Sequence, residues 1–309
     1  MLRIYLIIIC IIFSINQTVN ANSNKINIKI GSGNILEEYY SIGLKVCEYL
    51  TKIDDNIHCE VEPTFGSIES LNLLRDGTID FAFVQANLAL EAYKAEGSFA
   101  KQEPFKGLRQ VLRLHDEVFT VITRDDDKVL VFSDFDGKNI SNGSKNSDSS
   151  VTYNELIEHF KFDNPPNDIE ISHEKYANKL CNGEVDGIMM MTGHPNSLVS
   201  YIAYHCDTSF ITIDSDKIDL LIKNNPAFEK TTLNKGFYPG ITEDHETVKV
   251  AAIFVTNDKV NKELIKKLVK YIKNDEENFK LSHPVLSMLK EGHLTSAFIL
   301  PRFDNINNK

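Results

Sequence analysis

The sequence predicts an α/β protein built from two similar lobes that are joined by two crossover segments. Apolar strand patterns alternate with amphipathic helix patterns along most of the chain. The motif Leu-Arg-Asp-Gly-Thr-Ile-Asp at residues 74–80 returns as Leu-Cys-Asn-Gly-Glu-Val-Asp at residues 180–186, and an apolar strand follows each copy. With 309 residues, 42% hydrophobic and 25% charged, the chain is long enough for two domains of ordinary globular composition.

The charge balance argues against nucleic acid as a partner. Lys and Arg number 33 against 44 Asp and Glu, which gives a formal net charge of −11. No long basic run is present to neutralise phosphates.

The N-terminus predicts export. Arg3 precedes an apolar run at residues 4–15, and a polar stretch then ends in the small residue Ala21. This is the pattern of a secretory signal peptide covering residues 1–21, cleaved after about Ala21. The apolar run is shorter than the roughly 20 residues that a membrane-spanning helix needs.

The first lobe begins with a strand, a glycine turn and a helix. We expect the strand at residues 26–30, the turn at 31–34 and the helix at 39–50. A second strand, at 60–64, leads through Phe65-Gly66-Ser67 into a helix that starts at Ile68.

Two residues mark the ends of this second helix. Ser67 is the expected N-cap, and Gly77 suits the left-handed position after the last turn. A strand at residues 79–84 then runs into Gln85.

The second lobe repeats this order. A turn-rich loop at residues 142–150 precedes a helix at about 151–160, and the repeated motif leads into a strand at 187–191. A strand at 248–256, a helix at 261–274, a short helix from Pro284 and a frayed tail after Pro301 complete the chain.

The lobe boundaries follow from the place of the last strand. If it returns to the first sheet, the chain crosses between lobes near residues 118–124 and 242–248, and such double crossovers form hinges. Lobe 1 then comprises residues 22–123 plus 247–309, and lobe 2 comprises residues 124–246.

Four cysteines outside the signal peptide predict two disulfides, because an oxidising compartment favours pairing. Of the three possible connectivities we expect the local one, Cys47–Cys59 and Cys181–Cys206, each stabilising by roughly 3 kcal/mol. A zinc site is the alternative, but the chain has no Cys-x-x-Cys, no His-Glu-x-x-His and no tight Cys/His cluster.

Three loops predict where a ligand binds. Residues 31–34, 65–67 and 143–149 follow strands and precede helices, where free N–H groups favour an anion. The plainer alternative is that their Gly and Ser residues only form tight turns. His115 is a candidate donor to an acidic ligand at the hinge, and Arg113 and Arg124 are candidate clamps.

Catalysis and cofactor binding are not expected. The first loop lacks the third glycine of a dinucleotide fingerprint, and no loop is followed by Gly-Lys-Ser/Thr. A Gly-x-Ser-x-Gly nucleophile motif is also absent. We therefore expect no enzyme activity, no cofactor and no metal.

These motifs together resemble the TAXI family of solute-binding proteins of tripartite ATP-independent periplasmic (TRAP) transporters. The resemblance runs from about residue 28 to about residue 284. It is carried by the motifs at residues 31–43, 62–71, 80–87, 180–186, 193–196 and 236–240, together with the four cysteines.

The resemblance implies a type II periplasmic binding protein fold that closes on a small organic anion or amino acid and delivers it to TRAP membrane subunits. Glutamate, dicarboxylates and 2-oxo acids are the implied ligand class. Carried over by position, the implied ligand contacts are Ser32, Gly33, Tyr39, Gly66, Ser67, Gln85, Ser147, Ser149 and Tyr238.

The sequence departs from the family pattern at acidic positions. Glu37, Glu38 and Asp148 stand where the family's loops are rich in glycine or hydroxyl residues. If they point inward, they disfavour a second carboxylate and favour a zwitterion, a monoanion or a neutral ligand. A ligand-sensing or surface-exposed protein that acts through a protein partner is the alternative function.

Overall fold

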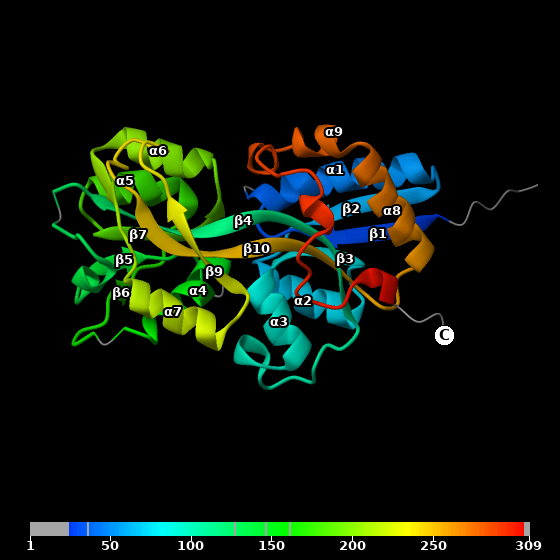
Figure 1. Cartoon of the computed structure of the whole chain (residues 1–309), viewed down its shortest axis with the longest axis horizontal. Helices are drawn as coiled ribbons and strands as arrows, with labels where there is room; N and C mark the ends of the chain where they lie inside the picture. Colours follow the sequence, from blue (N-terminus) through cyan, green and yellow to red (C-terminus); the bar gives the residue numbers. More distant parts are fainter. Residues whose placement is uncertain (1–24, 36, 127, 146, 161, 306–309) are drawn as a thin grey trace, which may run out of the picture.

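The computed structural model describes residues 25–35, 37–126, 128–145, 147–160 and 162–305. The predicted signal peptide lies outside this range. Two groups of elements lie at the two ends of a pair of long antiparallel strands, β4 (Leu108–Arg124) and β10 (His245–Asn257), as Figure 1 shows. The strands form one sheet in the order β2-β1-β3-β10-β4-β7-β5-β6.

Lobe 1 is a three-layer α/β unit. Its parallel strands are β1 (Ile26–Gly31), β2 (Ile57–Glu62) and β3 (Phe81–Gln85), and β3 also pairs with β10. Helices cover both faces of this half of the sheet (Figure 1). They are α1 (Glu38–Ile53), α8 (Lys262–Asn274) and α9 (Glu276–Lys280) on one face, and α2 (Ser67–Asp76) and α3 (Ala86–Lys94) on the other.

Lobe 2 is built in the same way. Its strands β5 (Asn139–Ser141), β6 (Asn167–Asp168) and β7 (Gly187–Gly193) are parallel, and β7 pairs with β4. The covering helices are α5 (Tyr176–Cys181) and α6 (Ser197–His205) on one face, and α4 (Asp148–Ile157) and α7 (Ser215–Asn224) on the other.

The remaining elements are short. Strand β8 (Thr208–Phe210) pairs with β4, and β9 (Phe228–Leu233) pairs with β10. Short 3-10 turns are found at Gly97–Phe99, Phe132–Phe135, His173–Lys175, Pro284–Leu286, His293–Thr295 and Phe303–Asn305.

The repeated sequence motif performs the same structural task in both lobes. Gly77 and Gly183 end α2 and α5 with φ of 78° and 73°. The carboxylate of Asp80 then accepts a hydrogen bond from the Lys29 backbone N–H (2.9 Å), and that of Asp186 accepts one from the Asn139 N–H (2.8 Å). Each motif thus ties the start of β3 or β7 to the neighbouring strand, which confirms the predicted repeat.

Several predicted boundaries were wrong. The N-cap of α2 is Gly66, because Ser67 is already the first residue of the helix. Gly66 has a φ of 128°, which glycine adopts readily and other residues avoid. Helix α4 begins at Asp148, with Ser147 as its N-cap. The tail is not frayed at Phe303, which is 5% exposed, because the Gln110 N–H binds Pro301 O (3.0 Å) and holds the chain end against β4.

The predicted disulfides are confirmed. Cys47 pairs with Cys59 across α1 and β2, and Cys181 pairs with Cys206 between the ends of α5 and α6. Within the described residues, no helix has the length and apolar character that crossing a bilayer requires.

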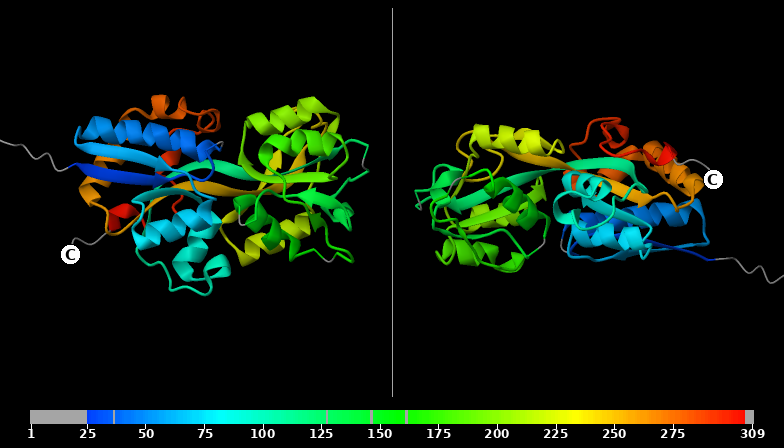
Figure 2. Two further views of the ribbon diagram at one scale, coloured as in Figure 1. Left: turned by 180° about the vertical axis from the view of Figure 1, so that it is seen from behind. Right: turned by 90° about the horizontal axis from the view of Figure 1, so that it is seen from below.

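The two lobes are joined by β4 and β10, which pass from one to the other in both further views (Figure 2). Near the lobe-1 end, β4 and β10 pair with each other, whereas toward lobe 2 they pair with β7 and β9. We propose the predicted boundaries, 123/124 and 246/247, as the division between the lobes.

Candidate functional site

A cavity of about 110 Å³ lies between the lobes, where the first turns of four helices meet. Helices α1 and α2 come from lobe 1, and α4 and α6 come from lobe 2. The lining residues are Glu37, Glu38, Tyr39, Phe65, Gly66, Glu117, Ser147, Asp148, Ser149, His173, Met190, Met191, Thr192, Asn196, Ser197 and Leu198.

Asp148 bridges the two lobes at the first turn of α2. Its carboxylate accepts hydrogen bonds from the backbone N–H of Ser67 (2.8 Å) and from the Ser67 hydroxyl (2.6 Å). The approach requires glycine at position 66, because a Cβ there would lie 2.9 Å from Asp148 Oδ1. Burial raises the pKa of Asp148, while the two Ser67 donors oppose that rise.

Glu38 makes a second bridge, from α1 to lobe 2. Its Oε1 accepts from the Thr192 hydroxyl (3.0 Å) and from Asn196 Nδ2 (2.9 Å). Asn196 is held in place because its Oδ1 caps α6 by accepting from the Val199 N–H (2.9 Å).

A buried carboxyl group, that of Glu117 on β4, borders the cavity. Gln85 Nε2 donates to it, and the side chain of Tyr39 lies beside it. Burial and, next, the nearby Asp148 charge raise the pKa of Glu117 well above its usual range. Burial and, next, the Glu117 charge also raise the pKa of Tyr39, so the phenol keeps its proton at neutral pH.

The cavity is acidic. Burial, followed by the charges of Asp148 and Glu38, raises the pKa of Glu37 to about 7. Among the described residues that line the cavity, none is a lysine or an arginine. Burial lowers the pKa of His173, so this imidazole supplies no full positive charge at pH 7.

The candidate ligand contacts fall into two groups. Tyr39, Gly66, Ser147 and Ser149 line the cavity, and Ser67 lies behind Asp148. The other candidates do not line it; they are Ser32, Gly33, Gln85 and Tyr238. Ser32 donates to Gly33 O and Glu62 O, Gln85 is held by Glu117, and the Tyr238 hydroxyl binds His194 and the Asn196 N–H.

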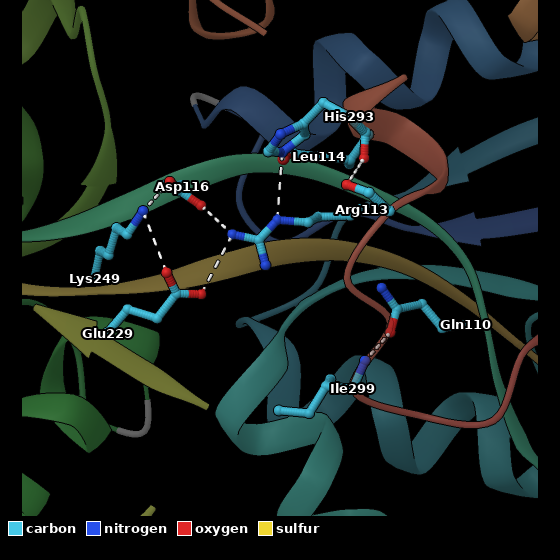
Figure 3. Close-up of polar contacts among 9 residues, drawn as sticks. Gln110, Arg113, Leu114, Asp116, Glu229, Lys249, His293 and Ile299 are labelled. Atoms are coloured by element: carbon cyan, nitrogen blue, oxygen red, sulfur yellow. Dashed lines mark hydrogen bonds and ion pairs between the residues drawn. The ribbon is translucent and has the colours of Figure 1, made fainter. Parts of the chain in front are cut away.

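The two candidate arginines do not contact the cavity. Arg113 belongs to an ion-pair network on the crossover strands, with Asp116 (2.7 Å) and Glu229 (3.6 Å), and Lys249 binds the same two carboxylates (Figure 3). Arg124 donates to the backbone of lobe 2 at Leu180 O (2.8 Å).

His115 lies in a different hollow. That hollow also contains His194 and His293, and burial lowers the pKa of His115 to about 4. His115 is therefore neutral at pH 7 and does not line the cavity between the lobes.

Several lining residues carry no strong sequence signal. Glu117 lies on a strand in which almost every residue is buried, so alternation does not reveal its direction. Thr192 directly precedes the Gly-His-Pro-Asn motif and Asn196 is its last residue, so this motif is the sequence signal for this wall of the cavity. Among the described residues, no three His, Cys, Asp or Glu side chains are arranged to hold a metal ion.

Comparison with protein families identifies the chain. The model of the NMT1-like family matches residues 30–303, and the chain belongs to this family of periplasmic solute-binding proteins. The family comprises receptors rather than enzymes, which confirms the expected non-enzymatic class. Its extracytoplasmic location agrees with the two disulfides.

Solved structures confirm the two-lobed periplasmic binding protein fold. A protein of Bordetella bronchiseptica RB50 has 14% identity and a TM-score of 0.53, over 87% of this chain and 77% of that chain. A putative L-cystine ABC transporter protein of Listeria monocytogenes has 12% identity and a TM-score of 0.51, over 87% and 99%.

A third similar structure comes from work on glutathione import by GshT and the cystine ABC importer TcyBC of Streptococcus mutans. It has 11% identity and a TM-score of 0.52, over 85% of this chain and 95% of that chain. Identities this low show the fold alone.

Proposed function

We propose that the protein is an extracytoplasmic receptor that closes on a small solute between its lobes and delivers it to the membrane subunits of a TRAP-type transporter. The observation that carries this proposal is the cavity lined from both lobes by the first turns of four helices. A ligand held by both lobes shifts an open–closed equilibrium toward the closed state, which a transporter can recognise.

The TRAP assignment is supported by the resemblance of the motifs to the TAXI family. Two of the similar structures carry the name of a cystine ABC transporter or importer, the second in work on glutathione import. The two transporter types differ in their membrane partners. Reconstitution with the membrane subunits encoded beside this gene, with and without ATP, distinguishes them, because only TRAP-type uptake proceeds without ATP.

The first experiment is native mass spectrometry of the exported protein, purified without added ligand, followed by identification of any solute that denaturation releases. We expect one small polar solute per chain. A chain that emerges empty, and whose Tm is unchanged by amines, amino acids, dicarboxylates and 2-oxo acids, contradicts the receptor function.

One observation favours the alternative of a sensing or surface protein. Asp148 and Glu38 connect the lobes through protein groups alone, so closure does not depend on a ligand for these contacts. Capture of a folded protein partner by a chain that binds no solute supports this second function.

A further inference from the structure

The first turn of α2 already holds a carboxylate, and this carboxylate belongs to the chain itself. A helix start with free N–H groups favours an anionic group. Here the backbone N–H and hydroxyl of Ser67, which we call the Ser67 donors, both bind Asp148. A ligand carboxylate at this position would have to displace Asp148.

The rest of the cavity offers acceptors and, among the residues that the structure describes, no cationic side chain. Glu37, Glu38 and Glu117 border it, and burial, followed by the charges of Asp148 and Glu38, raises the pKa of both Glu37 and Glu117. A second carboxylate from outside would meet like charges in a region that largely excludes water, where such repulsion is strong. An ammonium group would instead find several oxygen acceptors.

A separate observation also points to a ligand. Tyr39 lines the cavity and its side chain is only 5% exposed. Its hydroxyl lies beside the Glu117 carboxyl and has no hydrogen-bond partner of standard geometry among the described residues. Buried polar groups are rarely left unpaired, because desolvation without a hydrogen bond is costly. A ligand N–H that reaches the phenol oxygen would satisfy it.

We propose that Asp148 serves as an internal carboxylate that blocks anionic ligands at the Ser67 donors, and that the cavity between Glu37, Glu38 and Glu117 binds the ammonium group of a small amine. This inference rests on the proposed receptor function and specifies its ligand class. The cavity volume of about 110 Å³ suits a ligand as small as a short amine.

Isothermal titration calorimetry at pH 7 tests the proposal with four probes: 1,4-diaminobutane, L-lysine, succinate and L-glutamate. We expect the wild-type protein to bind one or both amines and neither succinate nor glutamate. Because an ammonium lowers the pKa of Glu37 from about 7, binding should release up to about half a proton per ligand. The release is measured by repeating the titration in buffers of different ionisation enthalpy.

Two variants locate the effect. Asp148→Ser frees the Ser67 donors and removes one charge, so succinate or glutamate binding should tighten at least tenfold while amine binding weakens about tenfold. Asp216→Ser is the matched control, because Asp216 also lies in the first turn of a lobe 2 helix but is exposed and outside the cavity. Glu37→Gln keeps the side-chain shape and should abolish most of the proton release.

The outcomes are distinct. Wild-type protein that binds succinate or glutamate and no amine overturns the ligand class and leaves the receptor function standing. Amine binding that Asp148→Ser and Glu37→Gln leave unchanged also overturns it, because the amine then binds elsewhere. If no probe binds and no solute is purified with the protein, both the ligand class and the receptor function fail.

Discussion

At the scale of single residues, the cavity depends on a buried carboxyl that is held by a neutral amide. Glu117 is 6% exposed, and Gln85 Nε2 is the side-chain donor to its Oε2. The Oε1 of Gln85 is buried without a partner among the described residues. The Nε2 of Gln85 therefore supports a cavity residue, and Gln85 does not itself line the cavity.

Gln85→Ala should therefore destabilise the fold. It leaves the Glu117 carboxyl buried without its donor, which costs about 1–3 kcal/mol of unfolding free energy. Urea denaturation measures the change. Gln102→Ala, at an exposed position, is the control and should have almost no effect. If Gln85→Ala matches the control in stability and weakens only ligand binding, Gln85 is a direct contact and this account of it is wrong.

The sequence predicts loops better than side-chain directions. The loops at residues 31–34, 65–67 and 143–149 are marked by local composition, since Gly and Ser favour turns and helix starts. Gln85 ends a strand whose five residues are all buried, so period-two alternation does not say which way it points. That direction depends on the packing of β3 between β1 and β10.

At the scale of elements, the repeated helix ending is the strongest link between sequence and fold. Gly77 and Gly183 both adopt the left-handed conformation that other residues avoid. Because a Cβ on Gly77 would meet nothing within 4 Å, a substitution there changes backbone strain and little else.

Gly77→Ala should lower the stability by roughly 1–2 kcal/mol, which corresponds to a Tm lower by about 2–8 °C in a lobe of this size. Gly77→Asn is the matched variant, because asparagine tolerates the left-handed region and should lose less. Differential scanning calorimetry measures both. Equal losses for Ala and Asn would show that strain at this residue is not the cause.

The lobe 2 copy shows where local patterns fail. Helix α4 starts at Asp148, three residues before the predicted start, because the Ser147 hydroxyl accepts the Ser150 N–H and caps it there. The loop composition predicted a turn, but the choice of cap among several serines depends on contacts with lobe 1. Those contacts are made by Asp148 itself.

At the scale of the whole molecule, the crossover strands carry a charge network that sequence patterns did not reveal. Arg113 and Asp116 lie on β4, Lys249 on β10 and Glu229 on β9, so the network joins residues more than a hundred positions apart (Figure 3). Arg113 Nε also approaches His293 (3.3 Å), which binds Leu114 O and holds the C-terminal segment on β4. The arginine proposed as a clamp therefore stabilises the connection between the lobes.

The lobes also meet at a pair of carboxyl groups outside the cavity. Glu91 of α3 and Glu155 of α4 lie together, and Asn87 and Asn225 donate to Glu155. Burial and, next, the Glu91 charge raise the pKa of Glu155 to about 8, so the pair shares a proton near neutral pH. The other charged or titratable groups in this groove are Lys94, Glu96, Glu158 and His159.

These shifts predict how stability depends on pH. The carboxyl pKa values are about 8 for Glu155 and about 7 for Glu37, against 4.5 in an unfolded chain. Near neutral pH the folded protein therefore binds more protons at these two groups than the unfolded chain does. Its Tm should therefore rise as pH falls from 8.5 to 6.5. Below 6.5 the rise should stop, because burial lowers the pKa of His115 and of His194 to about 4 and the unfolded chain then takes up protons that the folded chain cannot.

Glu155→Gln tests the origin of this dependence. It keeps the hydrogen-bonding shape and removes the group that titrates near pH 8, so the Tm should become nearly constant between pH 8.5 and 7.5, while the part of the rise due to Glu37 remains. Glu158→Gln, an exposed neighbour on the same face of lobe 2, should keep the wild-type profile. Two results would show that the Glu91–Glu155 pair does not hold this proton. One is a wild-type Tm that falls as the pH is lowered from 8.5 to 6.5, and the other is a Glu155→Gln variant whose Tm rises as much as that of the wild type.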